Sequence, residues 1–138
     1  MNLNKVFLIG RLVQDVDFKI TPTGTPLAVL NIATNRIYKD RNNQAQQETE
    51  YHRVIAWGKL AETCRDYLNK GRLLFIEGRL HYRTWLSQDG TKRTQTEIIA
   101  ENIRFGPKGL SEEVPEELDE FKEEKENHIP PDIWEISF

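Results

Sequence analysis

Aromatic and arginine side chains alternate in three segments of the sequence, with the spacing that places residues on one face of a β-strand. Flat rings stack on nucleic-acid bases, and arginines neutralise backbone phosphates. We therefore expect the three segments to form one surface that binds single-stranded nucleic acid with little sequence preference. Its expected residues, including three cations at the rim, are Arg36, Tyr38, Tyr51, Arg53, Trp57, Lys59, Arg79, Arg83, Trp85, Lys92 and Arg93.

Two of these rings have an alternative interpretation. Tyr51 and Trp57 could instead belong to the core of a second sheet layer. Arg53 lies between them with the same parity, and a charged side chain there favours an exposed face. Trp85 lies next to a polar hairpin turn, which also favours exposure.

The remaining reactive side chains do not form a catalytic or metal-binding pattern. His52 falls on the apolar side of its segment, so we expect it to be buried or at an interface. Cys64 lies on the apolar face of a predicted helix and is expected to pack there. The His, Asp and Glu residues show no metal-ligand spacing, and no carboxylate pair is set for acid–base chemistry. The sequence therefore predicts a protein that is not an enzyme and uses no metal or cofactor.

Length, composition and charge divide the chain into a body and a tail. The 138 residues suffice for one ordinary domain. Residues 1–105 carry 16 Lys and Arg against 11 Asp and Glu, a formal charge of +5, while residues 106–138 carry 3 against 11, a charge of −8. We expect 1–105 to be a folded domain and 106–138 a disordered acidic tail, because so few apolar residues cannot offset the entropy of ordering. A basic body with an acidic tail is frequent among proteins that handle nucleic acid.

The compartment also follows from composition. A single cysteine excludes a disulfide within the chain and fits a reducing environment. No apolar run approaches the ~20 residues of a membrane helix. The first apolar run, residues 6–9, is too short for a signal-peptide core. We therefore expect a cytoplasmic protein that does not enter a membrane.

Periodicity predicts an all-β body with one helix. The expected strands cover residues 5–13 with a possible extension to 20, 27–38, 49–57, 72–85 and 94–105. A helix is expected over 59–70, ended by Gly71 in a left-handed conformation. Gly10 and Gly78 fall inside strands, where glycine marks a bend or bulge. Long bent strands in so short a chain predict a five-stranded Greek-key barrel, the oligonucleotide/oligosaccharide-binding (OB) fold, with the helix between strands 3 and 4.

Several longer stretches, in this order and spacing, resemble the bacterial single-stranded-DNA-binding protein family over nearly the whole chain. They include Leu8-Ile9-Gly10-Arg11-Leu12. Three stretches are specific together, although each alone is weak: Tyr51-His52-Arg53-Val54, Gly58-Lys59-Leu60-Ala61-Glu62, and the run from Lys70-Gly71 to Glu77-Gly78. The resemblance implies that Tyr38, Tyr51, Trp57 and Trp85 stack bases. It also implies a homotetramer in which the first strand pairs with its copy in a second chain and His52 lies at a subunit interface.

The resemblance further implies that replication, recombination and repair proteins dock on the end of the tail. Family tails usually end in Asp-Ile-Pro-Phe, whereas this one ends in Glu135-Ile136-Ser137-Phe138, with serine in place of proline. The expected docking residues are Asp132, Ile133, Trp134, Glu135, Ile136 and Phe138.

We therefore expect a cytoplasmic, nucleoid-associated protein that coats single-stranded DNA and recruits partner enzymes. Two alternatives remain open at this point. One is an OB-fold module for replication restart, which would lack an acidic tail ending in phenylalanine. The other is an interaction scaffold whose barrel binds a protein, against which the surface of arginines and rings argues.

Overall fold

The computed structural model describes residues 1–107, which contain six strands and one helix. These elements are β1 (Val6–Leu12), β2 (Asp17–Ile20), β3 (Pro26–Lys39), β4 (Ala45–Trp57), α1 (Lys59–Tyr67), β5 (Leu73–Leu86) and β6 (Lys92–Phe105). Residues 108–138 of the predicted tail, which include all of its docking residues, lie outside the described residues. The helix of residues 1–107 is too short to cross a membrane.

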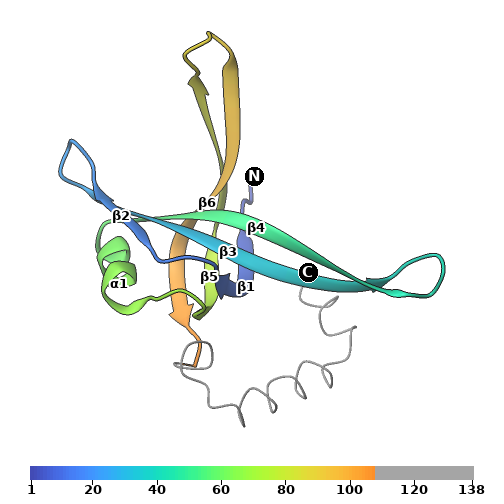
Figure 1. The fold of residues 1–138 in the computed structure, drawn as a ribbon. Coiled ribbons are helices and arrows are strands. Elements are labelled where there is room, and N and C mark those ends of the chain that lie inside the picture. The colour runs from blue at the N-terminus through green and yellow to red at the C-terminus, as the bar shows by residue number, and fades with distance from the viewer. Residues whose placement is uncertain (108–138) are drawn as a thin grey trace.

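Five strands close into a barrel in the order β1-β5-β6-β4-β3, with β3 pairing back to β1 (Figure 1). The pair β4–β6 is parallel, and the other pairs among the described strands are antiparallel. Because β1 and β2 together make up the first barrel segment, α1 lies between the third and fourth. The predicted five-stranded OB barrel is confirmed.

The predicted extension of the first strand to Ile20 is interrupted. From Val6 to Arg11, β1 pairs with β5, whereas β2 pairs with β3. At Arg11 and Leu12 the chain has already begun to pair with β3. Both sides of the break after Leu12 therefore pair with β3, and residues 13–16 between them have no ladder partner.

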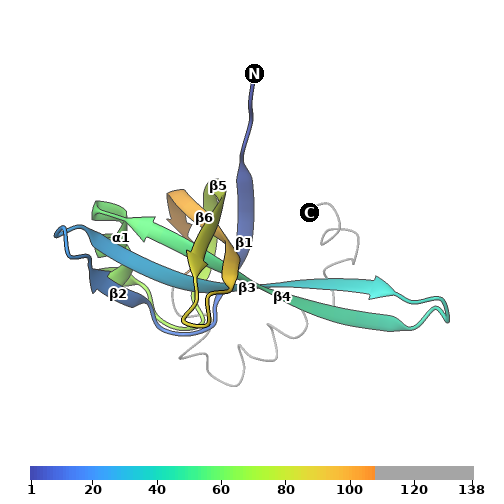
Figure 2. The same ribbon diagram turned by 90° about the horizontal axis from the view of Figure 1, so that it is seen from above.

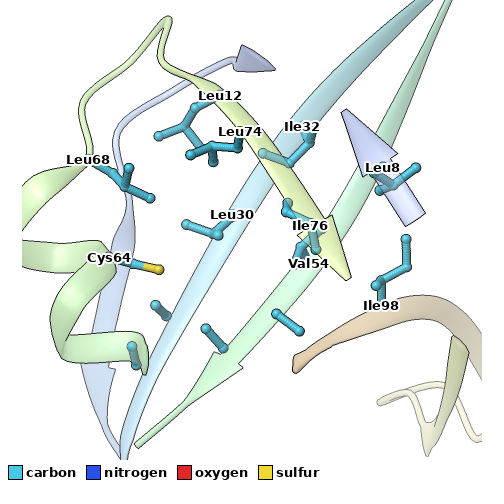
Figure 3. Packing of buried hydrophobic residues seen from close by; sticks show 14 residues of the cluster. Leu8, Leu12, Leu30, Ile32, Val54, Cys64, Leu68, Leu74, Ile76 and Ile98 are labelled. Carbon is cyan, nitrogen blue, oxygen red and sulfur yellow. The ribbon is translucent and has the colours of Figure 1, made fainter. Parts of the chain in front are cut away.

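Inward-facing side chains from all five barrel strands and α1 form one core (Figure 3). Cys64 reaches it from α1 and Leu68 from the residue that follows this helix. Cys64 is fully buried, as predicted, and burial raises the pKa of its thiol to about 11. The large side chains that are fully buried are Leu12, Leu30, Ile32, Val54, Cys64, Leu74 and Ile76. Burial of each such apolar side chain contributes about 1.5–3 kcal/mol, so this core is what holds the barrel closed.

Gly10 and Gly78 both lie where another strand comes very close, as their predicted role in bending requires. A Cβ atom on Gly10 would lie 2.5 Å from the carbonyl oxygen of Ala33. A Cβ atom on Gly78 would overlap the carbonyl oxygen of Ile99, and the β5–β6 register shifts between Glu77 and Gly78. Glycine is therefore required at these positions by space rather than by an unusual φ.

The helix is shorter than predicted, because α1 ends at Tyr67 rather than at residue 70. Leu68 has extended backbone angles, and its N–H still donates to the carbonyl of Cys64. Gly71 does have a positive φ of 91°, but it lies in the following loop, where its N–H donates to the carbonyl of Leu12. The left-handed glycine therefore ties the loop to β1 instead of ending the helix.

Two hairpins project beyond the barrel as two-stranded ribbons, one formed by β3 and β4 and the other by β5 and β6 (Figures 1 and 2). Their side chains become exposed where they leave the core. Leu80 and Tyr82, which continue the predicted apolar face of β5, are exposed for this reason. The buried part of that face ends at Gly78.

Replacing Gly10 tests the close approach of β1 to β3. The added methyl group of Gly10→Ala forces the backbone to shift against Ala33. Overpacking of this kind costs about 1–3 kcal/mol, and we expect that loss in the free energy of unfolding, measured by urea titration. Pro107→Ala is the control, because Pro107 is exposed at the end of the described chain and should cost little. An unchanged stability of Gly10→Ala would show that the two strands are not held at this distance.

Candidate nucleic-acid interface

The outward-pointing side chains of β4, β6 and β5 form one continuous surface, here called the outer face. Ile55 of β4 pairs with Ile99 of β6, and Ile99 pairs in turn with Arg79 of β5. Because side chains alternate along a strand, the odd-numbered residues near these pairs all point away from the core. The predicted residues that the outer face brings together are Tyr51, Arg53, Trp57, Arg79, Arg83, Trp85 and Arg93.

The three rings of the outer face are available for stacking. Tyr51 is 71% exposed, Trp57 46% and Trp85 37%. Side chains that belonged to the core of a second layer would be buried, so the alternative interpretation of Tyr51 and Trp57 is wrong. The guanidinium carbon of Arg83 lies 4.5 Å from the centre of the Trp85 ring, which adds a cation–π contact.

Arg36 and Tyr38 do not lie on the outer face, contrary to the prediction of a single surface. The continuous β3–β4 ladder places Arg36 opposite Glu48 and Tyr38 opposite Gln46, all with the parity of core-facing Val54. The two residues therefore lie on the other side of the β3–β4 ribbon, where the Arg36 guanidinium carbon is 5.1 Å from the centre of the Tyr38 ring. Parity within one strand gives no relation to the next strand until the register is known.

The predicted rim cations also separate. Arg93 pairs with Trp85 and shares its face, whereas Lys92 pairs with Leu86 and points to the opposite side of the β5–β6 ribbon. Lys59 is exposed at the first position of α1, two residues after Trp57.

A buried carboxylate on the outer face was not predicted. Glu97 of β6 is only 4% exposed, yet it lies among the outward-pointing residues of the sheet. Its Oε2 accepts from Nε of Arg53 at 2.8 Å and lies 3.5 Å from Nε of Arg83. Its parity with Arg93 in the sequence was visible, but the pairing with Arg53 depends on the β4–β6 register, which is not.

The other candidate side chains have structural surroundings. His52 is half-buried on the core side of β4, as predicted, and Nε2 lies 2.8 Å from Oγ1 of Thr34. Burial lowers the pKa of His52. His81 is exposed on the outer face, opposite Glu97. Within residues 1–107, no three His, Cys, Asp or Glu side chains are grouped to hold a metal ion.

Known proteins are similar to this chain in sequence and in fold. Residues 3–106 match the model of the single-strand binding protein family. The single-stranded DNA-binding protein 3 of Clostridium acetobutylicum is 40% identical over 126 residues, covering 91% of this chain and 85% of that protein. The single-stranded DNA-binding protein of Aquifex aeolicus is also 40% identical, and the match covers 99% of both chains. A solved structure described as a Plasmodium falciparum SSB complex with ssDNA matches with a TM-score of 0.72 at 33% identity, over 78% of this chain and 97% of the other.

Proposed function

The chain belongs to the single-strand binding protein family, and from this membership we propose that it binds single-stranded DNA of any sequence through its outer face. The observation that carries the proposal is the exposure of Tyr51, Trp57 and Trp85 on one side of the barrel. Every base has a flat face on which such rings can stack, so binding does not require a particular sequence. Arginines on the same side supply attraction for the phosphates.

Two further parts of the predicted surface belong to the same proposal. Arg36 and Tyr38 lie on the β3–β4 ribbon, which projects away from the barrel and leaves both of its faces free. Lys59 and Lys92 are exposed near the ends of the outer face. We propose that a DNA strand long enough to leave the outer face continues along these residues.

Binding and its dependence on the rings are tested together. The wild-type chain should bind oligo-dT far more tightly than duplex DNA, and its affinity should fall as salt rises. Trp57→Ala and Trp85→Ala should each cost about 1–3 kcal/mol of binding, because a stacked base loses its partner. Fluorescence anisotropy with a labelled oligonucleotide measures both.

Tyr67→Ala provides the matched control, because Tyr67 is 65% exposed but lies on α1, away from the outer face. It should leave affinity unchanged. Equal affinity of the wild type for duplex and single strands would remove the proposal. A loss of thermal stability rather than of binding in either tryptophan variant would mean that this ring supports the fold.

We propose also that the chain assembles as a homotetramer through β1. One edge of β1 pairs with β5, but within residues 1–107 the other edge has strand partners only at Arg11 and Leu12. Along this edge Phe7 and Ile9 are 58% and 57% exposed. An apolar strand with free N–H and C=O groups is a template for pairing with another strand, and a second copy of β1 provides one. His52 is proposed to lie at a subunit interface as well.

Charge introduced on β1 tests the assembly. Phe7→Lys places a cation on the free edge, a device that blocks strand pairing, so the mass should fall below that of four chains. Ile20→Lys is the matched control, since Ile20 is equally exposed at 58% but lies on β2. Sedimentation equilibrium at micromolar concentration should give a mass near four chains for the wild type and the control. A wild-type monomer would contradict the tetramer.

The acidic segment is proposed to recruit replication, recombination and repair proteins to DNA in the cytoplasm, where the nucleoid lies. Its support is the sequence: residues 106–138 carry a formal charge of −8 and include Asp132, Ile133 and Trp134 before Glu135-Ile136-Ser137-Phe138. Large apolar side chains among carboxylates suit an apolar pocket with a basic rim on a partner. The same charge can compete with DNA for the basic body at low salt.

Two truncations separate these roles of the acidic segment. Deleting 108–138 should leave DNA binding intact, or tighten it only at low salt, where screening lengths reach about 30 Å at 0.01 M. Removing Phe138 alone should not affect DNA binding but should abolish pull-down of helicases and repair enzymes from a bacterial lysate. Phe121→Ala, in the same segment, is the control and should retain them. Undiminished pull-down without Phe138 would show that the ending with Ser137 is not a docking peptide.

A further inference from the structure

Glu97 contacts two arginines of the outer face, Arg53 and Arg83, and in each case the contact is made to the Nε atom. Its Oε2 accepts from Nε of Arg53 at 2.8 Å and lies 3.5 Å from Nε of Arg83. The Glu97 side chain is 5% exposed, whereas those of Arg53 and Arg83 are 33% and 47% exposed. The carboxylate is therefore covered, while the guanidinium groups that cover it reach solvent.

Attachment through Nε leaves both terminal nitrogens of Arg53 and one terminal nitrogen of Arg83 available. Within residues 1–107, Arg53 makes no hydrogen bond through its two terminal nitrogens. Nη2 of Arg83 donates to Oε1 of Gln95 at 3.1 Å, and the group packs over Trp85 at 4.5 Å. Both guanidinium groups are thus fixed in orientation before a ligand arrives, which lowers the entropy lost on binding.

The same attachment makes these arginines poor neutralisers of phosphate. Two arginines and one carboxylate together carry a net charge of one, so the group attracts an anion no more than a single cation would. While Nε of each arginine stays on Glu97, that carboxylate balances part of their positive charge, so a phosphate at the terminal nitrogens gains less attraction than it would from an unpaired cation. Their fixed planes and free donors suit flat bases and base edges instead.

Other cations near the outer face are not constrained in this way. Lys59, Arg79 and Arg93 are exposed, and among residues 1–107 no carboxylate lies within 4.0 Å of their charged nitrogens. Arg79 stands opposite Ile99, at the edge of the apolar row that Ile99 forms with Ile55. These cations are free to follow a phosphate backbone.

We infer that Glu97 is a positioning residue that dedicates Arg53 and Arg83 to the bases and leaves phosphate neutralisation to Lys59, Arg79 and Arg93. The inference rests on the proposed binding of single-stranded DNA. It predicts that the two groups of cations differ in what they require. A base-directed guanidinium needs its planar fork, whereas a phosphate needs only a positive charge.

Matched substitutions by lysine test this division. Arg53→Lys keeps the charge but loses the planar group that lies against a base, so affinity for oligo-dT should fall about tenfold at every salt concentration, with an unchanged slope of log K against log salt. Arg79→Lys keeps the charge that a phosphate needs, so its slope should match that of the wild type and its affinity should fall less than that of Arg53→Lys. Arg79→Gln should instead flatten the slope, by about 0.7 for each chain that contacts the strand. Thermal denaturation of each variant checks folding.

Glu97→Gln tests the positioning residue itself. Loss of its charge releases both arginines, so the salt slope should steepen while affinity at high salt, where electrostatic attraction is screened, falls about tenfold. The Asp66→Asn variant is the control, because Asp66 forms an exposed pair with Arg65 at 2.8 Å on α1, away from the outer face. A purely structural Glu97 would lower thermal stability and leave the binding of the folded fraction unchanged.

The outcomes distinguish this inference from the proposed function. Absence of oligo-dT binding by the wild type would overturn the function itself. Wild-type binding together with equal behaviour of Arg53→Lys and Arg79→Lys would overturn only the division between the cations. If Glu97→Gln does not fold, Arg53→Lys and Arg79→Lys still test the division between the cations, because neither substitution removes a charge.

Discussion

The parallel contact between β4 and β6 is the constraint on which the rest of the structure depends. It consists of two residue pairs, Val54 with Ile98 and Ile55 with Ile99. The first pair belongs to the core, while the second points outward and joins β4 to the β5–β6 ribbon. So short a contact therefore closes the barrel and also sets the distance between Arg53 and Glu97 on the outer face. Fold and site cannot be separated at this position.

A small barrel with long strands resolves a conflict between stability and binding. Rings that stack on bases must be exposed, but exposed rings contribute little to a core. The core uses the inward-facing side chains of the barrel, while Tyr51 and Trp85 point away from it and are exposed. Substitutions on the ribbons can thus change binding without disturbing Leu30 or Ile76 at the centre.

The sequence predicts which side chains share a face within one strand. It does not predict which faces of two different strands lie on the same side of the sheet. The common face of Tyr51, Arg53 and Trp57 follows from alternation within β4, and their exposure confirms that they are not core residues. Alternation could not show that Arg36 lies on the other side of the sheet, because that depends on its pairing with Glu48. The ion pair between Glu97 and Arg53 could not be predicted for the same reason, because it depends on the register of β4 and β6. Pairing between distant segments is a property of the closed barrel, which no local pattern encodes.

The buried carboxylate of Glu97 lowers the attraction of the outer face for phosphate. Its presence there indicates that electrostatic attraction is not the contribution to binding that this surface maximises. Affinity from counterion release falls steeply as salt rises, whereas stacking on Trp57 or Trp85 does not depend on released ions. Glu97 cancels one positive charge and in return fixes two guanidinium planes. In the proposed function, the charge of −8 on residues 106–138 would act against the same electrostatic attraction and leave stacking unchanged. If the outer face binds single-stranded DNA as proposed, both features shift the balance of binding from charge towards oriented, flat contacts, which depend less on the salt concentration.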